Sequence, residues 1–184
     1  MKKLIFAFAA ILIAVNCNAQ IYKAKDGGTI SSFFSTAPLE DITATNKGAV
    51  VVMNTNTNDI QVRVTIQNFK FKNALMEEHF NENYMESQKF PNAVFKGKIN
   101  EKIDYTKDGE AKVTVTGKME MHGVTKEGTY EGILVKKGEE ITIKCKFKIK
   151  VADYNIQVPS LYVKNIAEVV DVDVTSVLEP YQKK

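Results

Sequence analysis

The segment Ile141-Thr-Ile-Lys-Cys-Lys-Phe-Lys-Ile-Lys-Val151 decides the fold class of this chain, because apolar and polar residues alternate along its whole length. Six apolar side chains share one face, and Thr142 and four lysines share the other. Successive side chains of a β-strand point to opposite faces, so the pattern is typical of a strand with one buried and one solvent-exposed face. Strands of this kind form antiparallel sheets.

Other segments repeat the same two-residue period. Residues 60–66 and 113–121 both alternate between apolar and polar side chains. A last run, 163–178, is rich in valine, and Asp171 and Asp173 fall on the face opposite its valine stripe. The alternation therefore extends over most of the chain, and we find no linker or long repeat that would divide it into several domains.

Short turns separate these runs. Asp108-Gly109 follows the run 93–106, and Lys137-Gly138 precedes the run 140–151. Both dipeptides are typical of β-hairpins. Long alternating strands joined by tight turns favour a strongly coiled sheet or a closed barrel, because a flat sheet of such strands would expose long edges to aggregation.

One segment, residues 74–86, carries a helical pattern within this β chain. Asn73 is the predicted N-cap, and Met76, Phe80 and Tyr84 follow at intervals of four residues. These features predict a short amphipathic helix. In a barrel, such a helix closes one mouth or packs beside it.

The N-terminus has the features of an export signal. Two lysines precede the apolar run 4–15, and Cys17 and Ala19 are the small residues at the positions that precede a cleavage site. A bilayer span takes about twenty apolar residues, more than this run contains. We therefore predict a cleaved signal peptide, residues 1–19, and one periplasmic domain, residues 20–184; secretion is the alternative. A short buried helix and acylation at Cys17 are the other interpretations.

Charge and cysteine content narrow the function classes. The chain has 25 Lys+Arg against 22 Asp+Glu, and loss of two lysines with the signal peptide leaves 23 basic residues and a formal charge of +1. Arg63 is the only arginine. Nucleic-acid sites rely on basic patches and arginine forks, so we expect no nucleic-acid partner. Only Cys145 remains after cleavage, which excludes an intramolecular disulfide.

Residues with catalytic or metal-binding chemistry are few. The two histidines, His79 and His122, are far apart in sequence, and no spacing typical of zinc, haem, phosphate or dinucleotide binding occurs. Cys145 lies on the apolar face of its strand, where an unpaired cysteine behaves as a small hydrophobe. We predict no catalytic residue, no metal and no cofactor. A transient metal site shared by the histidines and an enzyme acting on lipids are the alternatives.

The apolar face of the predicted sheet leaves two interpretations open. The inward isoleucine, valine, phenylalanine and methionine side chains either fill the interior completely or surround a lumen that binds an apolar ligand. Periodicity alone does not separate a packed barrel from an open one.

Three stretches of the chain resemble the YceI-like family of exported, lipocalin-like proteins. The first comprises Met76-Glu-Glu-His-Phe80, Tyr84-Met-Glu-Ser87 and Phe90-Pro-Asn-Ala-Val-Phe95. The second is Val115-Thr-Gly-Lys-Met-Glu-Met-His-Gly-Val-Thr125, and the third is Phe147-Lys-Ile-Lys-Val-Ala-Asp-Tyr-Asn-Ile156. They occur in the order and at the spacing of the family. The chain departs from it at 28–35, where the family often has a His-Ser-x-Ile-x-Phe strand.

The resemblance implies an all-β fold: an antiparallel eight-stranded lipocalin-like barrel with a short α-helical insert near residues 74–86. It also implies a lumen that holds an isoprenoid, such as a polyprenyl compound or a quinone, or a similar amphiphile. The predicted protein is therefore a non-enzymatic lipid carrier with an apolar partner, without a membrane-spanning segment after cleavage, and with a possible homodimer. The alternative is a packed β-domain that acts through its surface in envelope stress protection or assembly.

The predicted ligand contacts combine inward positions of the strands with residues of the insert. Phe80 and Tyr84 would guard the mouth, and His79 or His122 would offer a polar contact to a head group. The full set is Phe33, Met53, Val64, Phe80, Tyr84, Phe95, Val115, Met119, His122, Phe147 and Val170.

Overall fold

The computed structural model describes residues 21–36, 41–157 and 168–181. The predicted signal peptide and its cleavage site lie outside the described residues, as does the beginning of the predicted strand 163–178. The strands are β1 (Ile21–Ser35), β2 (Ile42–Asn46), β3 (Val50–Asn54), β4 (Asp59–Thr65), β5 (Lys70–Phe71), β6 (Asn92–Ile99), β7 (Gly109–Met121), β8 (Val124–Lys137), β9 (Glu140–Lys150) and β10 (Val169–Pro180). The helical segments are η1 (Ile66–Asn68), α1 (Ala74–His79), η2 (Phe80–Tyr84) and η3 (Val151–Tyr154).

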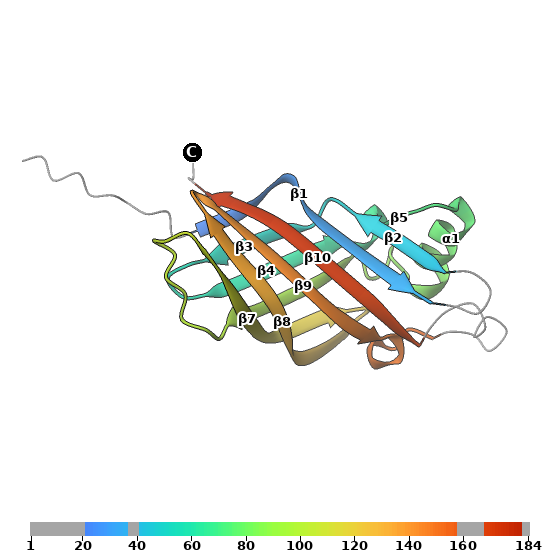
Figure 1. Ribbon diagram of the computed structural model, residues 1–184. Helices are drawn as coiled ribbons and strands as arrows, with labels where there is room; N and C mark the ends of the chain where they lie inside the picture. The colour runs from blue at the N-terminus through green and yellow to red at the C-terminus, as the bar shows by residue number, and fades with distance from the viewer. Residues whose placement is uncertain (1–20, 37–40, 158–167, 182–184) are drawn as a thin grey trace, which may run out of the picture.

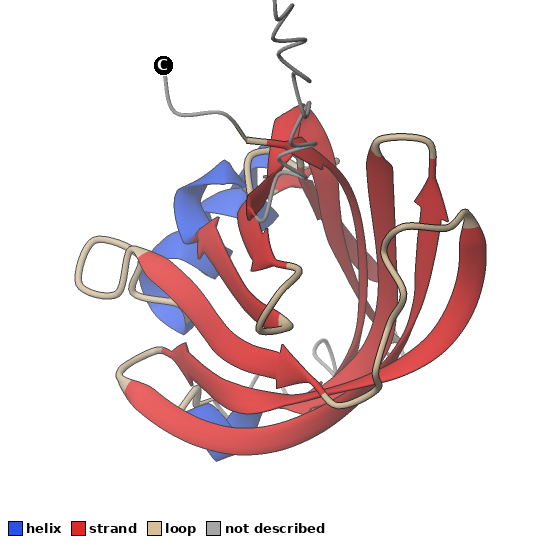
Figure 2. Ribbon diagram, turned by 90° about the vertical axis from the view of Figure 1, so that its left-hand side faces the viewer, coloured by secondary structure: helices blue, strands red, loops and turns tan. Residues whose placement is uncertain are grey.

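Eight of the strands close into a barrel, as predicted. Each strand pairs antiparallel with the next in the order β1, β3, β4, β6, β7, β8, β9 and β10, and β10 pairs with β1 to complete the ring. Figure 2, viewed from the end opposite the insert, shows the strands curving around one axis. Closure removes the exposed edges that a flat sheet would have.

Strand β1 changes partner along its length because of a large bulge. Ala24 faces Leu178 and Thr29 faces Ser176, so five steps along β1 match only two along β10. Before the bulge β1 pairs with β3; after it, β1 pairs with β2, which in turn pairs with the two-residue strand β5. Bulges bend a strand and often lie at the rims of barrels. Here the bend adds β2 and β5 to one end of the barrel (Figure 1).

A buried asparagine bridges the gap that opens where β1 leaves β3. Asn46, at the end of β2, has no exposed surface. Its Nδ2 donates to the carbonyl oxygen of Thr65 at 2.9 Å, and its Oδ1 accepts a hydrogen bond from the Gly48 amide at 2.8 Å. The side chain thus links β2 to the end of β4, which is not its neighbour in the sheet.

Two glycines allow β6 and β7 to approach closely. Gly97 and Gly117 are directly opposite each other, and a Cβ on Gly117 would lie 2.4 Å from the Gly97 Cα and 2.4 Å from the Lys96 carbonyl oxygen. The ring of Phe95 covers the pair, since its Cζ lies 2.8 Å from that same Cβ position. Glycine at such a position permits a close backbone approach and provides the sharp curvature of a small barrel.

The helical insert follows the prediction at its start and departs from it in the second half. The Asn73 side chain accepts a hydrogen bond from the Leu75 amide at 2.9 Å, which confirms the N-cap. Beyond His79 the chain continues as a π-helix, and the Met85 amide bonds to the Phe80 carbonyl at 2.9 Å. The wider turn brings Tyr84 and Met85 to the barrel side together, whereas regular helical spacing predicts only Tyr84 there.

The predicted strand 93–106 is too long. Strand β6 ends at Ile99, and a loop follows up to β7. The Glu101 carboxylate accepts hydrogen bonds from the Thr114 amide and hydroxyl, both at 2.8 Å, and Asp104 accepts one from the Thr106 amide at 3.0 Å. The Glu101 side chain thus takes the Thr114 amide of β7 just beyond the last β6–β7 pair, Ile99 and Val115, and β6 does not continue past that point. The Lys137-Gly138 turn is confirmed, with φ +56° at Gly138.

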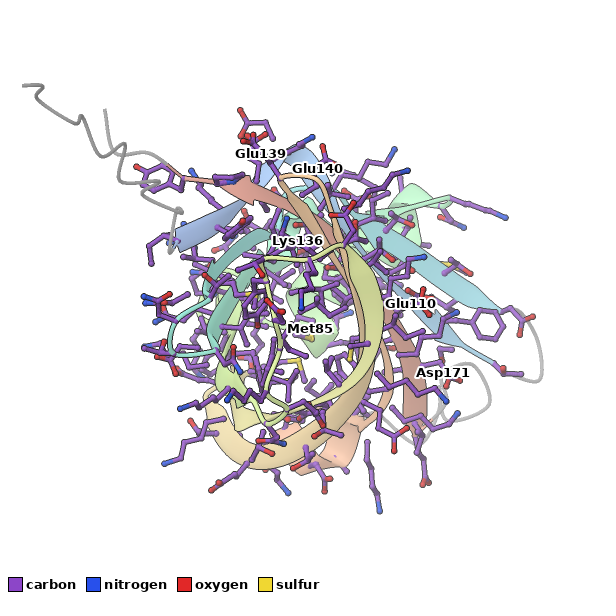
Figure 3. All side chains as sticks on the ribbon, turned by 60° about the vertical axis from the view of Figure 1, so that its left-hand side comes forward. Met85, Glu110, Lys136, Glu139, Glu140 and Asp171 are labelled. Carbon is purple, nitrogen blue, oxygen red and sulfur yellow. The ribbon has the colours of Figure 1, made fainter. Side chains whose placement is uncertain are left out.

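Two apolar clusters occupy opposite ends of the barrel. The larger is centred on Met53, Ile141 and Leu178, each with 0% exposure, and we call it the packed end. The smaller contains Ile66, Met85, Met121, Tyr154 and Ile156 and lies beside the insert. Figure 3 looks down the barrel and shows Met85 inside the ring of strands and Asp171 outside it. None of the helices in the described ranges is long and apolar enough to cross a membrane.

Candidate ligand-binding cavity

A cavity of about 640 Å³ lies inside the barrel between the two clusters. Its walls come from the inward faces of β1, β3, β4, β6, β7, β8, β9 and β10. Residues of the insert line the end of the cavity that lies away from the packed end. The size falls within the range of about 300 to 1,000 Å³ that is usual for sites of small apolar ligands. The interior is therefore filled at the packed end and hollow between that end and the insert.

Most of the predicted contact residues line this cavity. The nine that do are Phe33, Val64, Phe80, Tyr84, Phe95, Val115, Met119, Phe147 and Val170. They come from seven different elements. The strand residues among them reach the cavity because alternation turns their side chains to the inward face of the barrel. Their contact with a ligand stays a prediction.

The other two predicted residues are placed elsewhere. Met53 belongs to the packed end and does not line the cavity. His122, in the turn between β7 and β8, also lies outside the cavity lining. Its Nδ1 is 3.0 Å from the Tyr154 carbonyl oxygen, its Nε2 is 2.9 Å from Glu86 Oε2, and its ring lies 4.5 Å from that of Phe90. These contacts join the end of the insert to η3, which is a structural role.

Four phenylalanines form an aromatic collar where the cavity meets the insert. Phe33 lies 5.4 Å from Phe69, 5.7 Å from Phe71 and 5.5 Å from Phe80, measured between ring centroids. Phe80 also lies 5.6 Å from Phe69 and 5.0 Å from Phe71. Distances of 4.5–7 Å are favourable for aromatic pairs. The collar joins the bent half of β1, the segment 69–71 and the insert into one apolar rim.

Sequence reasoning missed half of this collar. Phe69 directly precedes β5 and Phe71 is its second residue, and a strand of only two residues is too short for a period to be recognised. Their position depends on the pairing of β5 with β2 and therefore on the bulge in β1. The cluster of three aromatic residues within 69–80 was the available signal.

Two polar residues of the insert, Asn73 and His79, lie at the same end of the cavity as the collar. Asn73 and His79 line the cavity there, and His79 is the last residue of α1. The insert is held to β5 by Glu77, whose carboxylate pairs with Lys70 at 2.5 Å and accepts from the Phe71 amide at 3.3 Å. The hydrogen bond from Lys70 is the largest of the effects that lower the pKa of Glu77.

A second aromatic group lies on the opposite wall. The Tyr130 ring is 5.6 Å from Phe95 and 4.9 Å from Phe147, in edge-to-face arrangements. Burial raises the pKa of Tyr130, and burial also raises the pKa of Tyr154 to about 12. Both phenols therefore stay protonated across the neutral range and act as hydrogen-bonding groups, not as bases.

Cys145 is a lumenal thiol, as the alternation predicted. It lines the cavity, and its Sγ donates to the Glu131 carbonyl oxygen at 3.1 Å. Burial raises its pKa to about 11, and nearby Asp173 adds to the effect. A thiol with a raised pKa is a poor nucleophile at neutral pH, since the thiolate is the reactive form. The cysteine thus serves as part of an apolar wall.

The cavity presents no arrangement typical of catalysis. Its described lining contains no Asp, Glu, Lys or Arg, so no carboxylate or ammonium group is available for acid–base chemistry there. Within the ranges that the structure describes, no three His, Cys, Asp or Glu side chains are grouped so that they could hold a metal ion. The arrangement is that of a site for an apolar molecule.

Comparisons with known proteins agree with this architecture. Residues 23–178 match the model of the YceI-like domain family. No curated protein matches the chain.

Several solved structures share the fold. A polyisoprenoid-binding domain from Saccharophagus degradans, implicated in plant cell wall breakdown, has a TM-score of 0.75 at 15% identity, and the match covers 87% of this chain and 98% of that one. BcnA of Burkholderia cenocepacia has a TM-score of 0.70 at 16% identity, with 84% and 98% covered. A Campylobacter jejuni YceI protein has a TM-score of 0.54 at 20% identity, with 74% and 81% covered.

The family match begins within β1 and ends within β10, so it includes residues of all eight strands of the closed barrel. The chain therefore belongs to the YceI-like family.

Proposed function

We propose that this protein is an exported, non-enzymatic lipid carrier that holds an isoprenoid, or a similar amphiphile with a long apolar tail, inside its barrel. The observation that carries the proposal is the cavity of about 640 Å³ with its almost wholly apolar lining. The similarity of the fold to that of the polyisoprenoid-binding domain from Saccharophagus degradans supports the choice of ligand class.

The energetics favour a long tail. Each buried CH₂ group contributes about 0.8 kcal/mol, so a chain that fills the cavity supplies a large gross affinity without any charged contact. Loss of translational freedom and of ligand flexibility offsets part of this gain. Side chains that line the cavity do not meet across the lumen, so a ligand there supplies contacts of the kind that side chains of the packed end make with one another.

The alternative, a packed β-domain that acts only through its surface, has less support. Such a domain would fill its interior along the whole axis. The barrel instead combines a filled end with a cavity and an aromatic collar. Export through the predicted signal peptide, periplasmic location and a homodimer remain part of the proposal.

Extraction of the purified protein with organic solvent, followed by mass spectrometry, tests the proposal. We expect a co-purified lipid with an isoprenoid or other long apolar tail. We also expect the delipidated protein to gain thermal stability when a prenol or quinone is added, because a ligand that binds only the folded state stabilises it. The absence of both a lipid and a thermal shift would contradict the proposed function.

A further inference from the structure

One wall of the apolar cavity carries hydroxyl groups. Alternation on the inward face of β1 after the bulge places Thr29, Ser31 and Ser35 in line with Phe33, and Ser176 faces Thr29 from β10. Ser31, Ser35 and Ser176 line the cavity, and the other lining residues of β10 are valines. Buried hydroxyls cost free energy unless they are hydrogen-bonded. A row of serines on this wall therefore calls for a hydrogen-bonding partner.

Ser31 is the member of this row whose hydroxyl has no partner. The Thr29 and Ser176 hydroxyls bond to each other at 2.7 Å. Ser31 is 3% exposed, and its Oγ is one of two buried side-chain polar atoms in the described residues that make no hydrogen bond, the other being Asn81 Oδ1 on the insert. Unsatisfied buried groups are rare in folded proteins, and each one calls for an explanation; beside an apolar cavity, a bound molecule is one.

The neighbours of Ser31 in the sheet do not provide that partner. Val174 on β10 faces it and is apolar. Asn46 on β2 also faces it, but its amide nitrogen and oxygen are bonded to Thr65 and Gly48. Rotation about one side-chain bond is enough to turn a serine hydroxyl, which has one donor and two acceptor positions, towards the lumen.

The charge of the lining restricts the chemistry of such a partner. The cavity lining that the structure describes contains no Lys or Arg, and His79 stands at the insert end. A carboxylate or phosphate buried beside Ser31 would have no cation to compensate the cost of leaving water. A hydroxyl or carbonyl group needs only one hydrogen bond.

We propose that the lumen selects a lipid with a neutral hydrogen-bonding group, a hydroxyl or a carbonyl, and that this group lies inside the barrel against Ser31 instead of projecting from the mouth. This inference rests on the lipid-binding function proposed above and specifies its ligand class. The tail then fills the space between Ser31 and the aromatic collar.

Three probes with the same branched chain test the inference: phytane, which has no polar group, phytanol, which has a hydroxyl, and phytanic acid, which is anionic at neutral pH. Their affinities for the delipidated protein are measured by calorimetry for the wild type, Ser31→Ala and Ser32→Ala. Ser32 is the matched control, because it is the next residue on the same strand and points outward.

We expect wild type to bind phytanol more tightly than phytane or phytanic acid. Ser31→Ala should weaken phytanol binding about fivefold, the effect of one neutral hydrogen bond, and leave phytane unchanged. The melting temperature of the ligand-free protein should not fall in Ser31→Ala, since the lost hydroxyl has no bond in the protein. Ser32→Ala should leave all three affinities as in wild type.

Equal binding of phytane and phytanol, or an equal loss for both in Ser31→Ala, would overturn the inference while the carrier function stands. Tightest binding of phytanic acid would overturn it as well, because the selected group would then be anionic. If none of the three probes binds although a lipid co-purifies or a prenol or quinone raises the melting temperature, the inference alone is overturned. If none of the three probes binds and those signs of lipid binding are also absent, the proposed function fails and the inference falls with it.

Discussion

The two ends of strand β9 carry the same sequence pattern and serve different purposes. Ile141 belongs to the packed end with 0% exposure, whereas Ile149, at the same phase of the same strand, lines the cavity. Strand β10 repeats the contrast, with Leu178 in the packed end and Val170 at the cavity. Alternation determines which face points inward. Whether the interior is filled depends on the side chains that meet across the barrel.

The difference between the ends arises from the elements that accompany each. At the packed end β1 pairs directly with β3, and large side chains from several strands interlock. At the other end the bulge turns β1 towards β2, and the insert provides the covering residues in place of a strand. One end thus contributes stability, and the other leaves space for a ligand.

Matched truncations in β9 should separate the two ends most strongly. Ile141→Ala removes fully packed atoms and should lower the free energy of unfolding by about 2 to 5 kcal/mol. Ile149→Ala enlarges an existing cavity and should cost about 1 kcal/mol, since its side chain has fewer contacts to lose. Chemical denaturation of both ligand-free variants measures the difference. Equal losses of unfolding free energy in the two variants would show that the cavity wall is packed as tightly as the packed end.

The glycine contact between β6 and β7 should produce the next largest effect. Gly117→Ala places a Cβ against the Gly97 Cα and the Lys96 carbonyl, so the strands must separate. We expect a loss of about 1 to 3 kcal/mol, typical of overpacking. Gly109→Ala is the control, because nothing lies within 4 Å of its Cβ position. A Gly117→Ala variant as stable as the control would mean that the wall does not need this close approach.

Filling the cavity should affect binding and not folding. Val172→Phe projects a ring into the lumen and should lower lipid affinity about tenfold or more, which corresponds to about 1.4 kcal/mol, with little loss of stability. Val177→Phe on the same strand is the control, since Val177 lies between the inward residues Ser176 and Leu178 and faces outward. Lipid titration and thermal melting of both variants provide the measurement. Unchanged affinity in Val172→Phe would place the ligand elsewhere.

The same contrasts explain which features of the fold and of the cavity could be predicted from the sequence. Alternation predicts the inward positions of Val64, Val115 and Phe147 correctly, because a strand's period does not depend on its neighbours. The N-cap at Asn73 is likewise local and is confirmed. The placement of Met53 in the packed end depends on the sheet pairing of short β3 with β1 and β4, which no local pattern encodes.

Features that arise from tertiary structure were not predictable. The bulge shifts the phase of β1 between Ala24 and Thr29, so the change of partner from β3 to β2 follows only from the structure. The π-turn after His79 and the contact of His122 with Glu86 depend on how the insert meets η3 and the β7–β8 turn. In each case a long-range contact decides between local conformations of similar energy.

The single cysteine of the chain beginning at Gln20 allows the most direct test of an occupied lumen. Because burial raises the pKa of Cys145 to about 11, its alkylation by iodoacetamide should be slow at neutral pH and should accelerate about tenfold per pH unit below that value. We expect saturating prenol to slow this reaction further in the folded protein and to have no effect in denaturant. Lipid binding that leaves the alkylation rate of Cys145 unchanged would contradict a ligand inside the barrel.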